Sequence, residues 1–322
     1  MADAPVVSGA VDAPDSHAGA RVAERGGWAM HEFTAMASPC RIVSDDDELV
    51  DIGVDTVRSF EARWSRFVPD SEVSAINRRA GEWCLVEPDT FRLFHAASVS
   101  FDRTGGRFDP LLGTRLDEFR AGDDERPLVS EPASPWDRSW PGQRRRLDVL
   151  PEVGAVLVPA GSSFDPGGIG KGLIGDIVVE RLVAAGAQTV QVELGGDVRL
   201  HGRRWSGGDW PVGVVEPIRR QGQVATIDVS HGAIATSSAA STWTVDGRAA
   251  HHLIDPATGL PAQTDLASVS VVGTELWWAE VVAKVAVMAG ANGARELLDR
   301  HALAGVLVHV DGFVEAVNGV GS

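Results

Sequence analysis

Apolar side chains in the first part of the chain recur every three or four positions, which is the spacing of one helix face. Residues 47–66 follow this pattern and predict an amphipathic helix, and a second helix is predicted to begin near Asp89. Between them Pro69 ends the first helix, and Asp70 or Ser71 is expected to cap a short helix that follows. The apolar positions of the two longer helices are Val50, Val54, Val57 and Trp64, then Phe91, Phe94 and Phe101.

From residue 146 onward the pattern changes to short apolar runs that are typical of strands. These runs are Ala155–Val158, Thr189–Glu193, Val212–Val215, Val224–Val229 and Leu266–Val272. Two helices are expected next, near 276–289 and 292–302, and then a hairpin of Gly305–Val310 and Phe313–Val317 that turns at Asp311-Gly312. Because helices cluster early and strands late, the predicted fold is α+β, with mixed β-sheets and packed helices.

Two segments differ from the rest in composition. Residues 1–27 are rich in Ala, Gly, Asp, Pro and Ser and poor in large apolar residues, which predicts a disordered lead. Residues 121–145 are polar and contain Pro, Asp, Arg and two Trp, which predicts a surface excursion or flexible loop. The remaining chain, 28–322, is predicted to form one domain.

Composition narrows the possible partners and compartments. The 322 residues carry a net charge of −16, which argues against a nucleic-acid or anionic-membrane surface. Two cysteines, Cys40 and Cys84, suggest neither a disulfide scaffold nor a cysteine-based zinc site. There is no secretory signal pattern, no early Cys to carry a lipid, and no apolar run near the ~20 residues that span a bilayer. We therefore expect a cytoplasmic protein without a transmembrane segment.

The segment Ser163–Gly172 combines a carboxylate, a glycine-rich turn and a lysine. A strand-like run precedes it and helical spacing follows, so the turn is predicted to lead into a helix N-terminus. Backbone N–H groups and the helix dipole favour an anion there, and Lys171 adds a charge. The spacing matches neither a Walker A loop nor the Rossmann fingerprint. A site for a phosphorylated ligand is one interpretation, and a purely structural glycine turn is the other.

Several further segments, taken in order, resemble the FAD:protein FMN transferase family, the ApbE-like flavin transferases, from Trp28 to Asn318. Residues 34–39 resemble the family's Met-Gly-Thr segment, residues 65–73 its Ser-x-Tyr-x-Pro-x-Ser-Glu run, and residues 106–113 the stretch that lines the flavin. The resemblance implies that this part of the chain binds FAD through Met36, Phe67, Phe108, Asp109 and Pro110. Phe67 stands where a Tyr is usual, so stacking survives without the hydroxyl.

The second half of the chain carries the more specific matches. Residues 165–172 match Asp-x-Gly-Gly-hydrophobic-x-Lys-Gly, and residues 252–259 match His-x-hydrophobic-Asp-Pro-x-Thr-Gly. A phosphate-binding segment is matched by 235–238, with Ser238 in place of Gly, and 193–197 resembles a Gly-Gly-Asp turn. The resemblance implies FAD contacts from Asp165, Lys171, Thr236, Ser237 and Leu253, and a magnesium contact from the Gly168 carbonyl.

One segment departs from the family pattern. The family's second metal segment reads Ala-Asp-x-x-x-Thr on a helix, and the matching run is Ala279–Lys284. Glu280 and Lys284 therefore stand at the positions of the Mg²⁺ ligands, but a charged Lys has no lone pair to give. The ammonium could repel the ion, replace it, or neutralise a pyrophosphate directly. A plain Glu280–Lys284 surface ion pair is the alternative.

The activity implied by the resemblance is transfer of FMN from FAD to a Thr or Ser hydroxyl of an acceptor protein, with release of AMP. His252 is the candidate general base, and Asp255 would orient it or the metal. No acceptor-type segment is found in the chain, so the acceptor is expected to be another protein. Two alternatives are an FAD-binding protein whose transfer activity Lys284 has abolished, and an FAD pyrophosphatase in which water replaces the acceptor.

Overall fold

The computed structural model describes residues 20–22, 28–120, 134–136, 138, 140, 146–204, 206–219 and 221–319. Most of the predicted lead and of the predicted excursion lies outside these residues. Within the lead, Ala20–Val22 forms strand β1 and pairs with the next strand, so the prediction of disorder is wrong for these three residues. The pairing covers a sheet edge that would otherwise present unpaired backbone groups.

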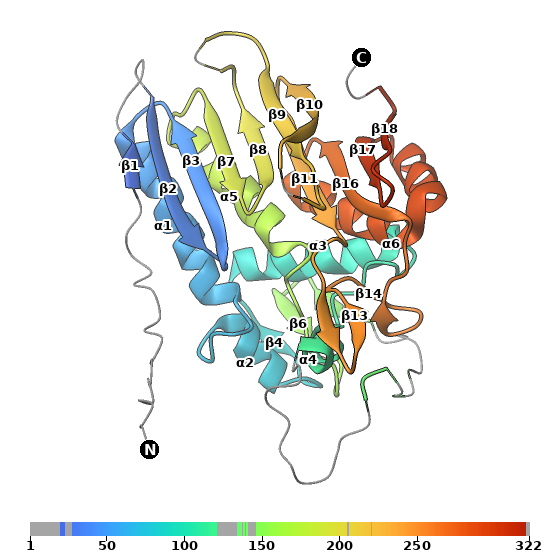
Figure 1. Ribbon diagram of the computed structural model, residues 1–322. Helices are drawn as coiled ribbons and strands as arrows, with labels where there is room; N and C mark the ends of the chain where they lie inside the picture. The colour runs from blue at the N-terminus through green and yellow to red at the C-terminus, as the bar shows by residue number, and fades with distance from the viewer. Residues whose placement is uncertain are drawn as a thin grey trace, which may run out of the picture.

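A nine-stranded sheet forms the centre of the molecule (Figure 1), and every neighbouring pair of its strands is antiparallel. Its strand order is β1-β2-β3-β7-β8-β11-β16-β17-β18. After β1 the strands are β2 (Ala29–Ala35), β3 (Ser38–Ser44), β7 (Val190–Leu194), β8 (Asp197–His201), β11 (Gly232–Ser238), β16 (Leu266–Gly273), β17 (Ala304–His309) and β18 (Val314–Val317).

Helices cover one face of this sheet and a hairpin covers part of the other. Helices α1 (Asp47–Trp64), α5 (Gly170–Ala184) and α6 (Leu276–Arg300) lie along the first face (Figure 1). On the other face, the hairpin of β9 (Trp210–Val215) and β10 (Gln223–Val229) buries a separate apolar cluster against the sheet. The strands beneath the hairpin are therefore buried on both faces of the sheet.

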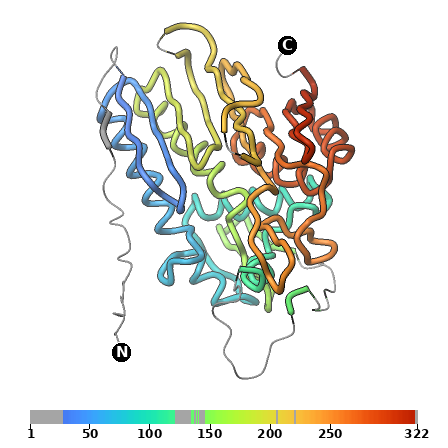
Figure 2. The backbone as a smooth tube through the Cα atoms, viewed as in Figure 1, coloured from blue at the N-terminus to red at the C-terminus, as the bar shows by residue number. Residues whose placement is uncertain are grey.

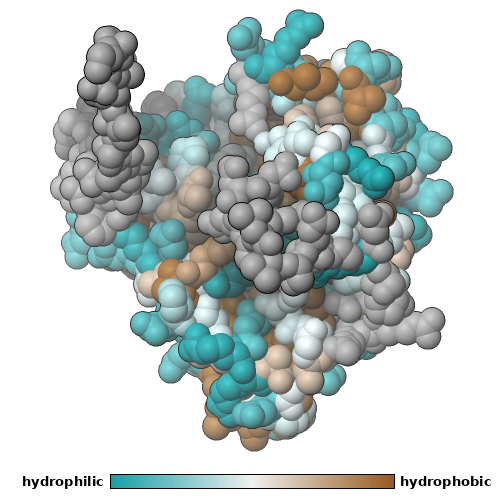
Figure 3. Space-filling view, turned by 60° about the horizontal axis from the view of Figure 1, so that its bottom comes forward, coloured by the Kyte–Doolittle hydropathy of each residue, from teal (hydrophilic) through white to brown (hydrophobic). Residues whose placement is uncertain are grey.

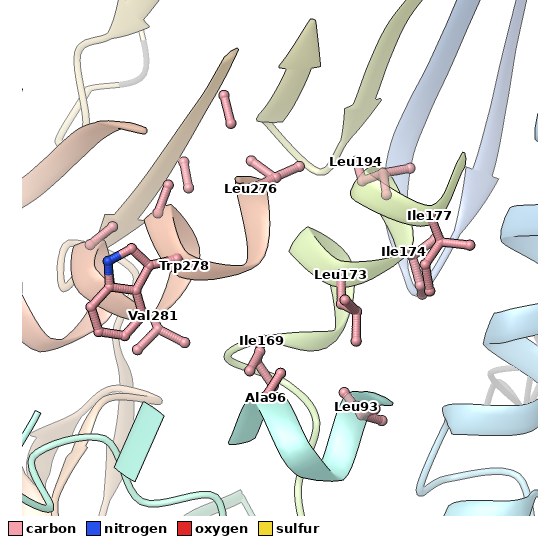
Figure 4. Close-up of a cluster of buried hydrophobic side chains, with 14 of the residues drawn as sticks. Leu93, Ala96, Ile169, Leu173, Ile174, Ile177, Leu194, Leu276, Trp278 and Val281 are labelled. Carbon is pink, nitrogen blue, oxygen red and sulfur yellow. The ribbon is translucent and has the colours of Figure 1, made fainter. Parts of the chain in front are cut away.

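A second layer lies below the sheet in the view of Figure 1. It contains α2 (Glu72–Arg78), α3 (Pro88–Arg103), α4 (Gly113–Arg120) and a small sheet of β4 (Cys84–Leu85), β6 (Ala155–Leu157) and β5 (Asp148–Leu150). Helix α3 packs beneath the first turn of α5, where Leu93 and Ala96 meet Leu173 and Ile169 (Figure 4). This contact fixes the position of the first turn of α5 relative to α3.

The chain between the sheet strands β11 and β16 descends to the lower layer (Figure 2). It forms two small hairpins, β12 (Trp243–Val245) with β13 (Arg248–Ala250), and β14 (Ile254–Asp255) with β15 (Leu260–Pro261). Val245, Ala250 and Ile254 pack on Leu116 and Phe119 of α4. The segment that contains His252 is thereby fastened beside the start of α5.

The α+β class and the helices and strands predicted from the pattern are confirmed. Ser71 caps α2 by accepting a hydrogen bond from the Ser74 N–H at 3.0 Å. The two helices predicted after residue 276 are joined in α6 by a kink at Gly290, whose φ is +68°. The described residues contain no helix with the length and apolar character that crossing a membrane requires.

Candidate functional site

A small, solvent-open cleft lies at the start of α5, between the descending segment and α6. Its walls come from four parts of the chain that are distant in sequence. The lining residues are Arg107, Phe108, Asp109, Leu112, Leu116, Asp165, Gly168, His252, Ile254, Pro256, Lys284 and Met288. Five of the residues predicted from the resemblance, together with Lys284, therefore meet in one place.

Helices α5 and α6 cap each other where they meet. Glu280 of α6 accepts a hydrogen bond from the Gly172 N–H of α5 at 2.7 Å. In return, Asp176 of α5 accepts from the N–H groups of Leu276 and Trp277 at 3.0 and 2.9 Å. Carboxylates at helix N-termini satisfy orphan donors and complement the helix dipole. Each helix start thus depends on a side chain of the other helix.

Gly172 allows the two helices to approach this closely. A Cβ atom at this position would lie 2.6 Å from the Cα of Trp277 and 2.7 Å from the carbonyl oxygen of Leu276. Both neighbours are backbone atoms, so neither can move aside like a flexible side chain. The second glycine of the Lys-Gly pair is therefore a packing requirement of the site.

Lys171 is held by a chain of polar contacts that reaches into the sheet. Its ammonium lies 3.0 Å from Asp197 Oδ2, and Asp197 Oδ1 accepts from the Thr236 N–H at 2.9 Å. Thr236 Oγ1 lies 2.8 Å from Ser270 Oγ. Burial disfavours the charge of Lys171, but Asp197 and Glu280 outweigh this effect and raise its pKa. Lys171 is therefore positively charged, with its ion pair already formed.

Lys284 projects from α6 toward the glycine turn at the mouth of α5. A Cβ atom at Gly168 would overlap the ammonium group of Lys284, so the lysine side chain lies directly against this glycine. Among the described residues, no carboxylate lies within ion-pair distance of Lys284. Burial lowers the pKa of Lys284, although the more distant charges of Asp165 and Glu280 oppose this effect. The predicted Glu280–Lys284 surface ion pair is wrong, because Glu280 is buried and turned to Gly172.

Asp165 is fixed by its own turn and by an arginine. Its Oδ1 accepts from the Gly167 N–H at 2.9 Å, and its backbone N–H donates to the Pro110 carbonyl at 2.8 Å. Arg66 Nε lies 3.4 Å from the same oxygen, while the two terminal nitrogens of Arg66 donate to Asp117 at 2.7 Å. Asp165 thus fastens the glycine turn to the lower layer and presents its carboxyl group to the cleft.

His252 lines the cleft as a neutral imidazole. Burial and the positive charge of Lys284 lower its pKa to about 3. The neighbouring His251 is structural: its Nδ1 accepts from the Leu253 N–H at 3.2 Å, and its Nε2 lies 2.9 Å from the Ala262 carbonyl. Of the two histidines, only His252 is available to a ligand.

Asp255 does not orient His252. Its Oδ1 accepts from the Ala257 N–H at 2.9 Å, and its carbonyl accepts from the Gly259 N–H at 2.7 Å. The carboxylate is therefore used to close the turn that follows His252. No hydrogen bond between Asp255 and His252 is found among the described residues, and the Asp-Pro-x-Thr-Gly sequence favours a self-contained turn. A catalytic role for Asp255 stays a prediction.

Asp109 is an unusual carboxyl group in the cleft wall. It is 8% exposed, its Oδ1 accepts from the Leu111 N–H at 2.8 Å, and its Oδ2 is buried without a hydrogen-bond partner among the described residues. Burial raises its pKa to about 7. The adjacent Phe108 is buried and lines the cleft, while Pro110 is buried and uses its carbonyl to hold Asp165.

The other predicted contacts lie farther from the cleft. Phe67 is 67% exposed and its ring stacks on Arg66, 4.3 Å from ring centre to guanidinium carbon. Met36 lies in the β2–β3 turn with φ +53°, and its N–H donates to Glu61 at 2.6 Å. Leu253 is fully buried, so only its backbone remains near the site. Ser237 follows Thr236 on β11 and is partly buried.

The residues at the predicted metal position do not fit Mg²⁺. Mg²⁺ prefers six oxygen ligands in a near-ideal octahedron. Glu280 has one oxygen engaged by Gly172, and the ammonium of Lys284 lies against Gly168, where the predicted carbonyl ligand stands. The described residues contain no cluster of three or more His, Cys, Asp or Glu side chains that could hold an ion.

Sequence reasoning missed three structural supports of the site. Asp176 was read only as part of a helix, yet it caps α6 and forms a 2.8 Å ion pair with Arg199. Arg115 is almost fully buried and donates to the carbonyl of Gly259 at 2.6 Å, which ties α4 to the turn after His252. Trp140 donates to the Pro256 carbonyl at 2.8 Å and packs on the same turn. A polar side chain in an otherwise apolar helix was the available signal for Asp176.

Fold and site together define an α+β protein with a cleft at a glycine-rich helix start. The model of the ApbE family matches residues 36–307, and the chain belongs to this family. It is 29% identical to the FAD:protein FMN transferase of Treponema pallidum over 248 residues, 71% of this chain and 68% of that protein. The FAD:protein FMN transferase of Haemophilus influenzae is 26% identical over 261 residues, 78% of this chain and 75% of that protein.

Solved structures agree with this assignment. The ApbE protein of Thermotoga maritima superposes with a TM-score of 0.77 at 25% identity, covering 90% of this chain and 97% of that one. The flavin transferase ApbE of Vibrio cholerae superposes with a TM-score of 0.75 at 20% identity, with the same coverage. At that identity the second likeness concerns the fold alone.

Proposed function

We propose that this chain transfers FMN from FAD to a Thr or Ser hydroxyl of an acceptor protein and releases AMP. The observation that carries the proposal is the meeting of Lys284, the Gly168 turn and the neutral His252 in one cleft at the start of α5, where Lys171 is the second helix residue. Membership of the ApbE family and the names of its relatives support it. FAD is the donor substrate, and the acceptor is a separate protein.

The pyrophosphate of FAD is the part that the cleft binds best. Gly172 at the start of α5 is capped by Glu280, but the Lys171 N–H has no acceptor among the described residues. A free helix N–H beside an ammonium group is an anion site. The chain as a whole is acidic, with a net charge of −16, so an anionic ligand needs local positive groups such as these.

The transfer is a displacement at phosphorus. The acceptor hydroxyl oxygen attacks the phosphorus on the flavin side, and a new P–O bond forms. The bond from that phosphorus to the bridging oxygen breaks, and AMP leaves with the electron pair. Lys171 and Lys284 stabilise the charge that develops on the phosphate oxygens.

His252 takes the proton of the attacking hydroxyl. Its pKa of about 3 keeps the imidazole neutral at physiological pH, so it can accept a proton. Part of that depression comes from Lys284, and a bound pyrophosphate would offset the charge of this lysine. Substrate binding therefore raises the basicity of His252 at the moment it is needed.

The flavin end is expected to meet Phe108 and Asp109 in the cleft wall. The Oδ2 atom of Asp109 lacks a partner and is able to exchange a hydrogen bond with a polar edge of a flavin ring. Phe67 offers an exposed aromatic face outside the cleft, backed by Arg66. A ring system can stack on this face.

The test is incubation of the purified protein with FAD and a Thr-containing acceptor domain, followed by AMP release and acceptor mass. We expect AMP together with an FMN-sized mass gain. His252→Ala should bind FAD but transfer roughly 10²–10⁴-fold more slowly. Release of AMP and FMN without labelling of any acceptor would favour the pyrophosphatase, and intact bound FAD without AMP would favour a flavin-binding protein.

A further inference from the structure

The chain contains only two lysines, Lys171 and Lys284, against 27 arginines. Every other fixed positive side chain along the sequence is an arginine. Both lysines lie at the same helix start, one on α5 and one on α6, and Lys284 lines the cleft. An ammonium group is therefore used only at this site.

The contacts explain why arginine does not serve at position 284. The ammonium of Lys284 lies against Gly168, in the space that a Cβ atom at this position would take. A lysine presents a compact point charge with three rotatable donors, whereas the guanidinium is a wide planar fork. An ammonium group that lies this close to a backbone turn resembles a small bound cation, because it is compact and presents a positive charge at the same place.

The two lysines differ in what neutralises them. Lys171 has Asp197 at 3.0 Å, while Lys284 has no carboxylate within ion-pair distance among the described residues. Glu280, one turn away on the same helix, is turned to the Gly172 N–H. A charge in a partly enclosed cleft without a partner is costly unless an anion enters from solution. Lys284 is thus arranged to meet a ligand rather than the protein.

We propose that Lys284 occupies the place of a divalent cation, and that Lys171 and Lys284 together bind the pyrophosphate of FAD without any metal ion. This inference rests on the proposed function and adds its electrostatic requirement: a resident ammonium in place of Mg²⁺. The donor set supports it independently, because one oxygen of Glu280 already accepts from the Gly172 N–H and the ammonium of Lys284 lies beside Gly168, the position of the predicted carbonyl ligand.

The experiment measures FAD binding by quenching of flavin fluorescence, without acceptor, in EDTA and in millimolar MgCl₂. We expect the same Kd for the natural chain in both buffers. Lys284→Met should weaken binding about tenfold or more in both. Lys284→Thr should weaken it in EDTA and recover part of the loss in MgCl₂, because Thr supplies a ligand oxygen. Arg92→Met removes an exposed charge of the Arg92–Glu180 pair and should leave Kd unchanged.

A second readout does not depend on any variant folding. The electron paramagnetic resonance signal of free Mn²⁺, titrated with the natural chain, should show no binding. A stoichiometric Mn²⁺ site, FAD binding that requires Mg²⁺, or a folded Lys284→Met variant that binds FAD as well as the natural chain would overturn the inference. Acceptor labelling separates the two proposals. Labelling that occurs only with Mg²⁺ would support the transferase function and reject metal-free binding. FAD binding without metal and without labelling would support metal-free binding and reject the transferase function.

Discussion

The starts of α5 and α6 touch each other, yet one is closed by the protein and the other is left open. At α6 the carboxylate of Asp176 takes two backbone N–H groups and an arginine. At α5 Glu280 takes only the Gly172 N–H, and the Lys171 N–H has no acceptor among the described residues. The same physical device serves architecture in one helix and ligand binding in the other.

The difference teaches how to separate structural from functional polar groups. A buried carboxyl group with every oxygen engaged, such as Asp176, fixes two elements and has nothing left for a ligand. A charge or an N–H that lacks its partner, such as Lys284 or the Lys171 amide, is complete only when something binds. Hydrophilic and hydrophobic residues are mixed over the visible face of the molecule (Figure 3), so surface hydropathy does not make this distinction.

The largest effect is expected at the start of α5, where the Lys171 N–H has no acceptor among the described residues. Lys171→Met removes the paired ammonium and leaves Asp197 without its 3.0 Å partner. We expect transfer to fall by roughly 10²–10³-fold, the size of losing one preorganised charge at a transition state. Steady-state AMP release measures this effect. A rate within threefold of the natural chain would mean that the open start of α5 is not the phosphate site.

The substitution Asp176→Ala removes the carboxylate that caps the start of α6. Two helix N–H groups and Arg199 lose their acceptor, so the free energy of unfolding should fall by about 3 kcal/mol. Urea denaturation gives the value. Glu180→Ala is the matched control, because Glu180 lies on the same helix in an exposed pair with Arg92 and should cost less than about 1 kcal/mol. Equal losses of unfolding free energy in the two variants would show that the α6 cap stabilises the protein no more than an exposed ion pair does.

Asp109 sharpens the contrast with Asp176, because its Oδ2 is buried without a partner. Its folded pKa of about 7 lies above its unfolded value of 3.8. The folded protein therefore holds a proton that the unfolded chain has released, and this contribution to stability is lost as pH rises from about 4 through 7. Relative to Asp109→Asn, the natural chain should lose stability over that window.

Urea unfolding of both proteins at pH 5 and pH 7.5 tests this expectation. Taking the difference between the two proteins removes the contribution of His252, whose lowered pKa acts in the opposite direction. A difference that stays constant with pH would place Asp109 in a solvated or fully paired environment.

The smallest effect concerns the turn between β2 and β3, which lies beside the β7–β8 turn at the open end. Both Met36 and Ala37 have φ of +53°, a conformation that favours Gly or Asn in a two-residue hairpin. Ala37→Gly should therefore stabilise the protein by about 0.5–1 kcal/mol. Thermal unfolding checks the sign, and a lowered Tm would mean that the strain at Ala37 is absent.

Sequence patterns predicted the main helices because their apolar positions recur at helical spacing and their caps are local. Strands β2, β3, β8 and β11 were not predicted. Residues 232–238 are mostly small and polar, and the β2–β3 turn lacks the usual Asn or Gly, so neither gave a local signal. Their strand conformation is decided by pairing with neighbours that are distant in sequence.

The site could be predicted where a motif is contiguous. Asp165, Lys171 and His252 come from such motifs and lie together at the start of α5. The motif does not show where the Asp255 carboxylate points, and the structure places its Oδ1 on the Ala257 N–H. The cross-capping by Glu280 and Asp176 depends on how α5 and α6 meet, which no local pattern encodes.

The most direct test of the central claim is a titration of the ¹⁵N-labelled protein with inorganic pyrophosphate in EDTA, followed by amide chemical shifts. We predict that the amides from Gly168 to Lys171 shift strongly and saturate, while those of Leu276 and Trp277 stay bound to Asp176 and move much less. Shifts of equal size at both helix starts, or none at the start of α5, would contradict the account.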